Sequence, residues 1–129
     1  MSASRMTTSS VSTVNELTSE GAVQSFTVDA DARLSTPIDT VDSGGDSPAF
    51  IVALSTGEVA VANYGSGNAR IMPTTSQESK FNSDAPLITF PTQDGTDSHP
   101  HMVLEHKNEI LIPDLVRRFS ADFPSVFLI

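Results

Sequence analysis

The chain has 129 residues, enough for one ordinary domain, and its 38% apolar content lies outside the range of disordered proteins. Sixteen acidic and seven basic side chains give a formal charge of −9, which argues against nucleic acid or an anionic membrane as a partner, since both need a basic face. The absence of cysteine excludes disulfides and cysteine-based metal sites, and no apolar run approaches the roughly 20 residues of a membrane span. Without an apolar secretory core near the N-terminus, the expected location is cytoplasmic.

The first part of the chain is rich in small polar residues. Residues 1–20 contain ten Ser or Thr, so they can bury little surface and are expected to form a disordered lead, with Val11–Leu17 as a candidate for a frayed strand. From Ala22, β-forming residues predict a strand that ends at the turn Asp29–Asp31. Leu34–Val41 is a second, weaker extended segment.

The middle of the chain alternates short apolar runs with turns. No segment of ten or more residues shows a convincing helical period, so the predicted class is all-β. Tight turns at Thr56–Glu58 and Gly65–Asn68 join the first three strands, and a polar loop at Pro73–Asp84 leads to the fourth. The four strands form one antiparallel meander and are predicted at Ala49–Leu54, Val59–Asn63, Ala69–Met72 and Leu87–Phe90.

The same layout recurs about fifty residues later. A Gly/Pro or His/Pro turn, an apolar run, a tight charged turn and a second apolar run occur at Ser47–Tyr64 and again at His101–Asp114. A repeat of this length built from short strands indicates a β-propeller blade. We therefore predict a β-propeller fragment at residues 21–115, with one complete four-stranded blade and parts of two neighbours. Residues 116–129 are predicted to be a divergent apolar tail.

Antiparallel strand order also predicts which loops lie together. The loops Gly44–Ser47 and Tyr64–Asn68 should reach the same face, and His99–His101, which enters the next blade, should join them. The turns Thr56–Glu58 and Glu105–Glu109 should lie on the opposite face, with His106 exposed there. The polar residues expected on the first face are Asp46, Asn63, Tyr64, Asn68, His99 and His101.

The residues alone leave two interpretations of that face open. His101 could act as a general base, because an imidazole titrates near neutral pH, or it could be a turn residue bonded to a neighbouring loop. Asn63 and Tyr64 precede a Gly-rich turn and are typical turn formers, and Asp114 is most simply a cap of the strand end. Histidines two apart on a strand point to opposite faces, so neither a metal nor any other cofactor is expected. Spacing alone favours the structural interpretation.

Four motifs taken together resemble the lactonase family of seven-bladed β-propellers, over about Val23 to Leu115. They are GGDSPAF at 44–50, GEVAVANYGSGN at 57–68, HPHMVL at 99–104 and ILIPDL at 110–115. The family includes 6-phosphogluconolactonases and fungal carboxy-cis,cis-muconate cyclases. The resemblance implies that His101 is catalytic and that His99, Asn63 and Tyr64 bind substrate.

The implied substrate is a small lactone or carboxylate. In the hydrolytic version of the reaction, a base such as His101 activates water for attack on the lactone carbonyl. In the cyclase version, a carboxylate adds across an alkene to close the lactone. The resemblance does not distinguish the two.

The sequence also departs from the family. Such a protein has seven blades, whereas this chain resembles an N-terminal fragment, and Val116–Phe119 does not continue the family pattern after PDL. The family's active-site Arg and acidic residues lie in later blades, and Arg70 does not match them; it is expected to face solvent. We therefore expect this chain to be inactive alone. The alternatives are a non-catalytic propeller module that binds a partner and a truncated gene product without its own function.

Overall fold

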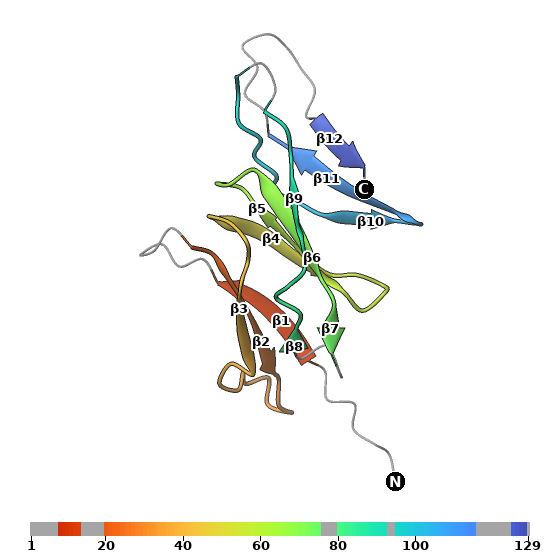
Figure 1. The fold of residues 1–129 in the computed structure, drawn as a ribbon. Helices are drawn as coiled ribbons and strands as arrows, with labels where there is room; N and C mark the ends of the chain where they lie inside the picture. The colour runs from red at the N-terminus through yellow and green to blue at the C-terminus, as the bar shows by residue number, and fades with distance from the viewer. Residues whose placement is uncertain (1–7, 14–19, 76–79, 93–94, 116–124, 129) are drawn as a thin grey trace.

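The computed structural model describes residues 8–13, 20–75, 80–92, 95–115 and 125–128 (Figure 1). Within these ranges every regular element is a β-strand, which confirms the all-β prediction. Three antiparallel sheets of three or four strands follow one another from one end of the molecule to the other, in the order in which the chain builds them, beside one two-stranded hairpin. The central sheet is the complete blade, and the outer two are parts of neighbouring blades.

The central blade has four strands in chain order: β4 (Pro48–Ala53), β5 (Val59–Asn63), β6 (Asn68–Met72) and β9 (Leu87–Thr89). This is the meander predicted from the sequence. The turn between β4 and β5 contains Gly57 at a φ of 90°, a left-handed conformation that glycine adopts without steric cost.

The core of the molecule lies on both sides of this blade. Every residue of β5 is buried. Because successive side chains of a strand point to opposite faces, Val59 and Val61 pack with Val23 of the preceding sheet, whereas Ala60 and Ala62 pack with Ile112 of the following sheet. The two neighbours therefore complete the core of the blade.

The preceding sheet consists of β1 (Thr8–Thr13), β2 (Ala22–Thr27) and β3 (Asp39–Asp42), with β2 in the middle. β1 lies in the segment predicted to be a disordered lead, and it pairs residue by residue with β2. A Ser/Thr-rich segment has few side chains to bury, but its backbone groups can extend the ladder of an existing strand, and Thr favours strands. The rest of the predicted lead, apart from Glu20, lies outside the described residues.

The following sheet consists of β10 (Leu104–His106), β11 (Glu109–Asp114) and β12 (Ser125–Leu128), with β11 in the middle. The β10–β11 hairpin lies in the predicted second copy of the repeat, but β10 extends into the predicted turn Glu105–Glu109, and residues 101–103 of the predicted apolar run are not strand. β12 falls in the predicted divergent tail and pairs antiparallel with β11. The segment 116–124 lies outside the described residues, and the domain boundaries near 20 and 115 stay predictions.

A small hairpin interrupts the predicted polar loop between β6 and β9. It is formed by β7 (Thr74–Thr75) and β8 (Lys80–Phe81). The backbone N–H of Phe81 donates to the carboxylate of Asp39 at 2.9 Å, and the Phe81 side chain is buried with Val23 and Met72. The hairpin therefore links the central blade to the preceding sheet.

Candidate functional site

The first two predicted loops meet through backbone hydrogen bonds. The N–H groups of Tyr64 and Gly65 donate to the carbonyls of Ser47 and Asp46, each at 3.0 Å. The Asp46 N–H in turn donates to the hydroxyl of Ser66 at 2.7 Å. The loop that enters β4 and the turn between β5 and β6 therefore form one continuous surface.

The third loop joins them through residues 98–101, which we call the HPH strap. His99 places Nδ1 2.9 Å from the carbonyl oxygen of Tyr64. At Gly67, where φ is 63°, a Cβ atom would lie 2.8 Å from the carbonyl oxygen of Ser98, so a side chain at this position would collide with the strap. The convergence of three loops on one face, predicted from antiparallel order, is confirmed.

His99 is held by two contacts with the same residue. Its ring stacks on the ring of Tyr64, with centroids 4.5 Å apart and 17° between the planes. The Nδ1 contact is to a carbonyl oxygen, which can only accept a hydrogen bond, so Nδ1 must carry the proton. In the neutral ring Nε2 is then the basic atom.

His101 has a different environment. Its side chain is exposed, and its Nδ1 lies 3.3 Å from the carbonyl oxygen of His99, a contact that favours the same tautomer, with Nε2 as the basic atom. Its backbone N–H donates to the carbonyl of Pro113 at 3.3 Å. Of the two histidines, His101 thus offers the more accessible base and His99 the more rigid ring.

Asn63 lies behind this face rather than on it. Its side chain is 0% exposed, and Nδ2 donates to the Ser43 carbonyl at 2.9 Å and to Oδ1 of Asn68 at 2.8 Å. Asn68 extends this bonding to the Gly44 carbonyl at 3.1 Å. The placement favours the structural interpretation of Asn63, whose predicted role in binding substrate stays a prediction.

Asp114 is a site residue to which the sequence assigned only a capping role. It ends β11, is fully buried, and accepts a hydrogen bond at Oδ1 from the backbone N–H of His99. Its Oδ2 has no hydrogen-bond partner among the described residues. The signal available in the sequence was a carboxylate at the end of an apolar run that follows a His-Pro-His segment.

Arg70 also differs from its expected position. It is half-buried instead of facing solvent, and its guanidinium donates to the carbonyl of Asp42 at 3.1 Å. A long side chain on β6 therefore packs against the loop that enters β4, where the predicted site begins.

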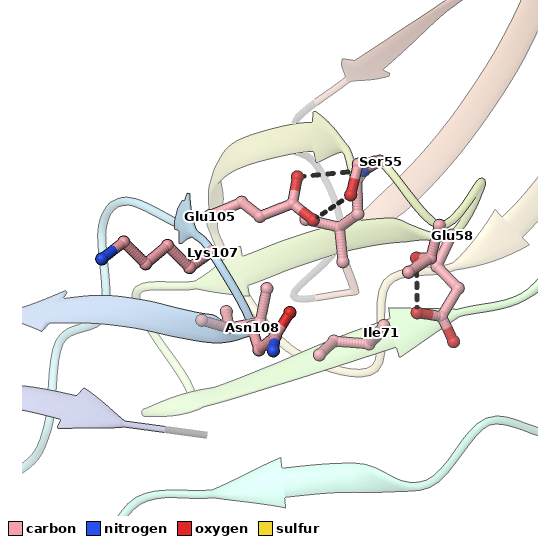
Figure 2. A pocket seen from close by; sticks show the side chains of 9 residues that line it. Ser55, Glu58, Ile71, Glu105, Lys107 and Asn108 are labelled. Carbon is pink, nitrogen blue, oxygen red and sulfur yellow. Dashed lines mark hydrogen bonds between the residues drawn. The ribbon is translucent and has the colours of Figure 1, made fainter.

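The opposite face carries the two predicted tight turns and the exposed His106. Figure 2 shows the Glu105 carboxylate against Ser55, whose N–H and hydroxyl donate to it at 2.9 and 2.5 Å. These hydrogen bonds lower the pKa of Glu105 from its ordinary value. Beside them is an open pocket of about 320 Å³ with Leu54, Ile71 and Ile110 among its lining residues.

The described ranges contain neither a cluster of metal-ligand residues nor a membrane-spanning helix. No group of three or more His, Asp or Glu side chains there could hold a metal ion. No helix in those ranges is long and apolar enough to cross a membrane.

A four-stranded blade between two partial sheets, with three loops gathered at one face, defines a segment of a β-propeller. The profile of the family described as "Lactonase, 7-bladed beta-propeller" matches residues 3–117, and the chain belongs to this family.

A solved structure shares the fold. It is that of a candidate 6-phosphogluconolactonase from Bacteroides fragilis NCTC 9343, with a TM-score of 0.66 and 19% sequence identity. The similarity covers 88% of this chain and 33% of that protein, so the chain spans about a third of the length of the structure it matches. Among curated proteins, none matches the chain.

Proposed function

We propose that the face formed by the three loops is part of an active site that hydrolyses a sugar-acid lactone of the 6-phosphogluconolactone type. The observation that carries this proposal is the exposed His101, whose Nδ1–H tautomer is favoured on that face, in a chain of the lactonase family. The description of the Bacteroides fragilis structure supports the choice of substrate class.

The proposed reaction uses His101 as a general base. Its Nε2 takes a proton from water as the water oxygen bonds to the lactone carbonyl carbon. The resulting tetrahedral intermediate expels the ring oxygen, breaking its bond to the carbonyl carbon, and the imidazolium returns the proton to that oxygen. The net change is lactone plus water to hydroxy acid, and the histidine is regenerated.

His99 and Tyr64 would bind the substrate. Their stacked rings form a rigid surface against which the apolar face of a sugar ring can pack, and Nε2 of neutral His99 can accept a hydrogen bond from a sugar hydroxyl. Asn63 would act indirectly, because its buried amide joins the loops that support Tyr64.

The rest of the proposed site would come from other blades. The chain corresponds to a third of the Bacteroides fragilis protein, and a phosphorylated lactone needs cationic groups to hold its phosphate. We propose that further blades supply these groups, that the 129-residue chain alone does not turn over substrate, and that the complete protein acts in the cytoplasm.

The test begins with translation of the DNA downstream of the Leu115 codon in all frames. If in-frame blades are found, the ring-complete protein is assayed with 6-phosphogluconolactone and carboxymuconate, beside His101→Ala and the control His106→Ala. We expect lactone hydrolysis to fall by about 100-fold or more in His101→Ala and to be unchanged in His106→Ala.

Several outcomes would contradict the proposal. Turnover of carboxymuconate alone would replace hydrolysis with cyclisation, and an active His101→Ala would remove the assigned base. If no blades are encoded downstream, the purified 129-residue chain is assayed directly. The absence of those blades refutes the lactonase proposal for this gene product, and lactone turnover by the chain would contradict its proposed inactivity.

A further inference from the structure

We infer that Asp114 is a positioning residue for the HPH strap, whose buried carboxylate fixes the backbone of His99 and thereby the direction of both imidazoles. The catalytic consequence rests on the proposed function, but the geometric claim does not. Asp114 touches neither the proposed base nor the stacked rings; it acts through the main chain of the strap.

The strap is attached to the end of β11 at several points. Oδ1 of Asp114 accepts the His99 N–H, and the residues Pro100 and Asp114 form an isolated antiparallel bridge. The Leu115 N–H donates to the His99 carbonyl at 3.1 Å, and the His101 N–H donates to the Pro113 carbonyl at 3.3 Å. Of these attachments, only the first is made by a side chain, so only that one depends on the identity of residue 114.

Packing alone does not explain a carboxylate at this position. Asp114 is 0% exposed, its Oδ2 has no hydrogen-bond partner, and no cation pairs with it among the described residues. A buried carboxylate with one hydrogen bond is costly, and an apolar side chain of similar volume would serve a merely structural strand end better. What the carboxylate adds is an acceptor for the His99 N–H.

That acceptor controls both rings through His99. The His99 residue presents its N–H to Asp114 and its carbonyl oxygen to Nδ1 of His101, while its own ring stacks on Tyr64. A change in the His99 backbone would therefore shift the His99 ring relative to Tyr64 and remove the acceptor that favours the Nδ1–H tautomer of His101. Displacement of a reacting group by about 1 Å can cost on the order of 100-fold in rate.

The experiment compares three substitutions in the 129-residue chain by NMR of the histidine rings. Asp114→Asn keeps an oxygen acceptor but removes the charge, whereas Asp114→Leu removes the acceptor. Ser98→Ala is the matched control, because the Ser98 hydroxyl is buried in the same strap without a hydrogen-bond partner among the described residues. The readouts are the ring-current shift of His99 from Tyr64 and the ring ¹⁵N shifts that report each tautomer.

We expect Asp114→Asn and Ser98→Ala to keep both histidine signals. Asp114→Leu should lose the ring-current shift of His99 and give mixed tautomers at His101, while the amide signals of β5 stay in place. In a ring-complete protein, Asp114→Leu should also lower kcat by about 100-fold with a much smaller change in KM, and Asp114→Asn should restore most of the activity.

Unchanged histidine signals in Asp114→Leu would overturn the inference. So would equal disturbance in Asp114→Asn, since that would assign the effect to charge and not to the acceptor. If Asp114→Leu does not fold, Asp114→Ala takes its place because it also removes the acceptor: loss of the His99 ring-current shift supports the inference, and unchanged histidine signals contradict it. Failure of the wild-type protein to hydrolyse lactone would defeat the proposed function without altering these spectra, so the two claims fail separately.

Discussion

His99 and His101 occupy one short strap, yet their side chains have different surroundings. The ring of His99 stacks on Tyr64 and the ring of His101 is exposed, although the Nδ1 atom of each ring lies against a backbone carbonyl oxygen. The alternation of side chains along an extended chain predicts that the two rings diverge. It cannot predict which ring meets Tyr64, because that contact joins residues far apart in sequence and depends on how the loops are closed.

Burial of Asn63 leads to a prediction at the scale of a single residue. Asn63→Ala would leave the Ser43 carbonyl and Oδ1 of Asn68 without their donor, so the free energy of unfolding should fall by about 2 kcal/mol. Urea denaturation measures this loss. Asn108→Ala, at an exposed position, is the control and should change stability little. Equal stability of the two variants would show that the buried amide does not support the loops.

At the scale of elements, the four strands that the apolar runs predicted for the central blade are present in the structure. The apolar run at β5 predicted burial of both faces, and its valines and alanines pack on opposite sides. The strands β7, β8 and β12 were missed, and β1 was predicted only as a candidate frayed strand at Val11–Leu17. β1 pairs with β2, β12 pairs with β11, and β7 pairs with β8 in a short hairpin. These strands are defined by backbone hydrogen bonds to a neighbouring strand, and their side-chain pattern is only a weak signal in the sequence.

The turn between β5 and β6 provides a prediction about loop contact. Gly67 and Gly57 both have positive φ, but only at Gly67 would a Cβ atom meet the strap; nothing lies within 4 Å at Gly57. Gly57→Ala should therefore lose about 1–2 kcal/mol from backbone strain alone, and Gly67→Ala about 3 kcal/mol from strain and collision together. Thermal or urea unfolding compares them. A Gly67→Ala variant as stable as Gly57→Ala would place the strap elsewhere.

The link between the Ser55 turn and the β10–β11 hairpin gives a pH prediction. Ser55→Ala removes the hydroxyl that most lowers the pKa of Glu105, so this pKa should rise toward its ordinary value of 4.5. Because the pKa of Glu105 is lower in the folded chain, its hydrogen bonds with Ser55 stabilise the fold at pH values above the ordinary pKa. This stabilisation is lost as the pH falls through the lowered pKa.

NMR titration of the Glu105 side chain measures the shift. Thr56→Ala is the matched control, because the Thr56 hydroxyl donates to Glu58 and should leave the pKa of Glu105 unchanged. A titration curve for Glu105 that is identical in wild type and Ser55→Ala would show that the two turns do not meet.

At the scale of the whole molecule, the repeat predicted both the blade and the loops that share a face. Antiparallel order was sufficient, because it decides at which end each connection lies. Solvent accessibility was not predictable in this way: Asn63 is buried behind the face, Arg70 packs against a loop, and Asp114 supports the strap. These positions depend on side-chain contacts between sheets, which local sequence does not specify.

Three loops from separate parts of the chain form one face, on which the rings of Tyr64 and His99 are in contact. Tyr64 is the single tyrosine of the sequence, so its ring signals can be identified without ambiguity. The most direct test is a search for nuclear Overhauser effects between the ring protons of Tyr64 and His99 in the purified chain. We predict clear effects, as expected for ring centroids 4.5 Å apart. Their absence in a chain whose β4–β5–β6 pairing is intact would show that His99 does not lie on Tyr64 and that the three loops do not form this face.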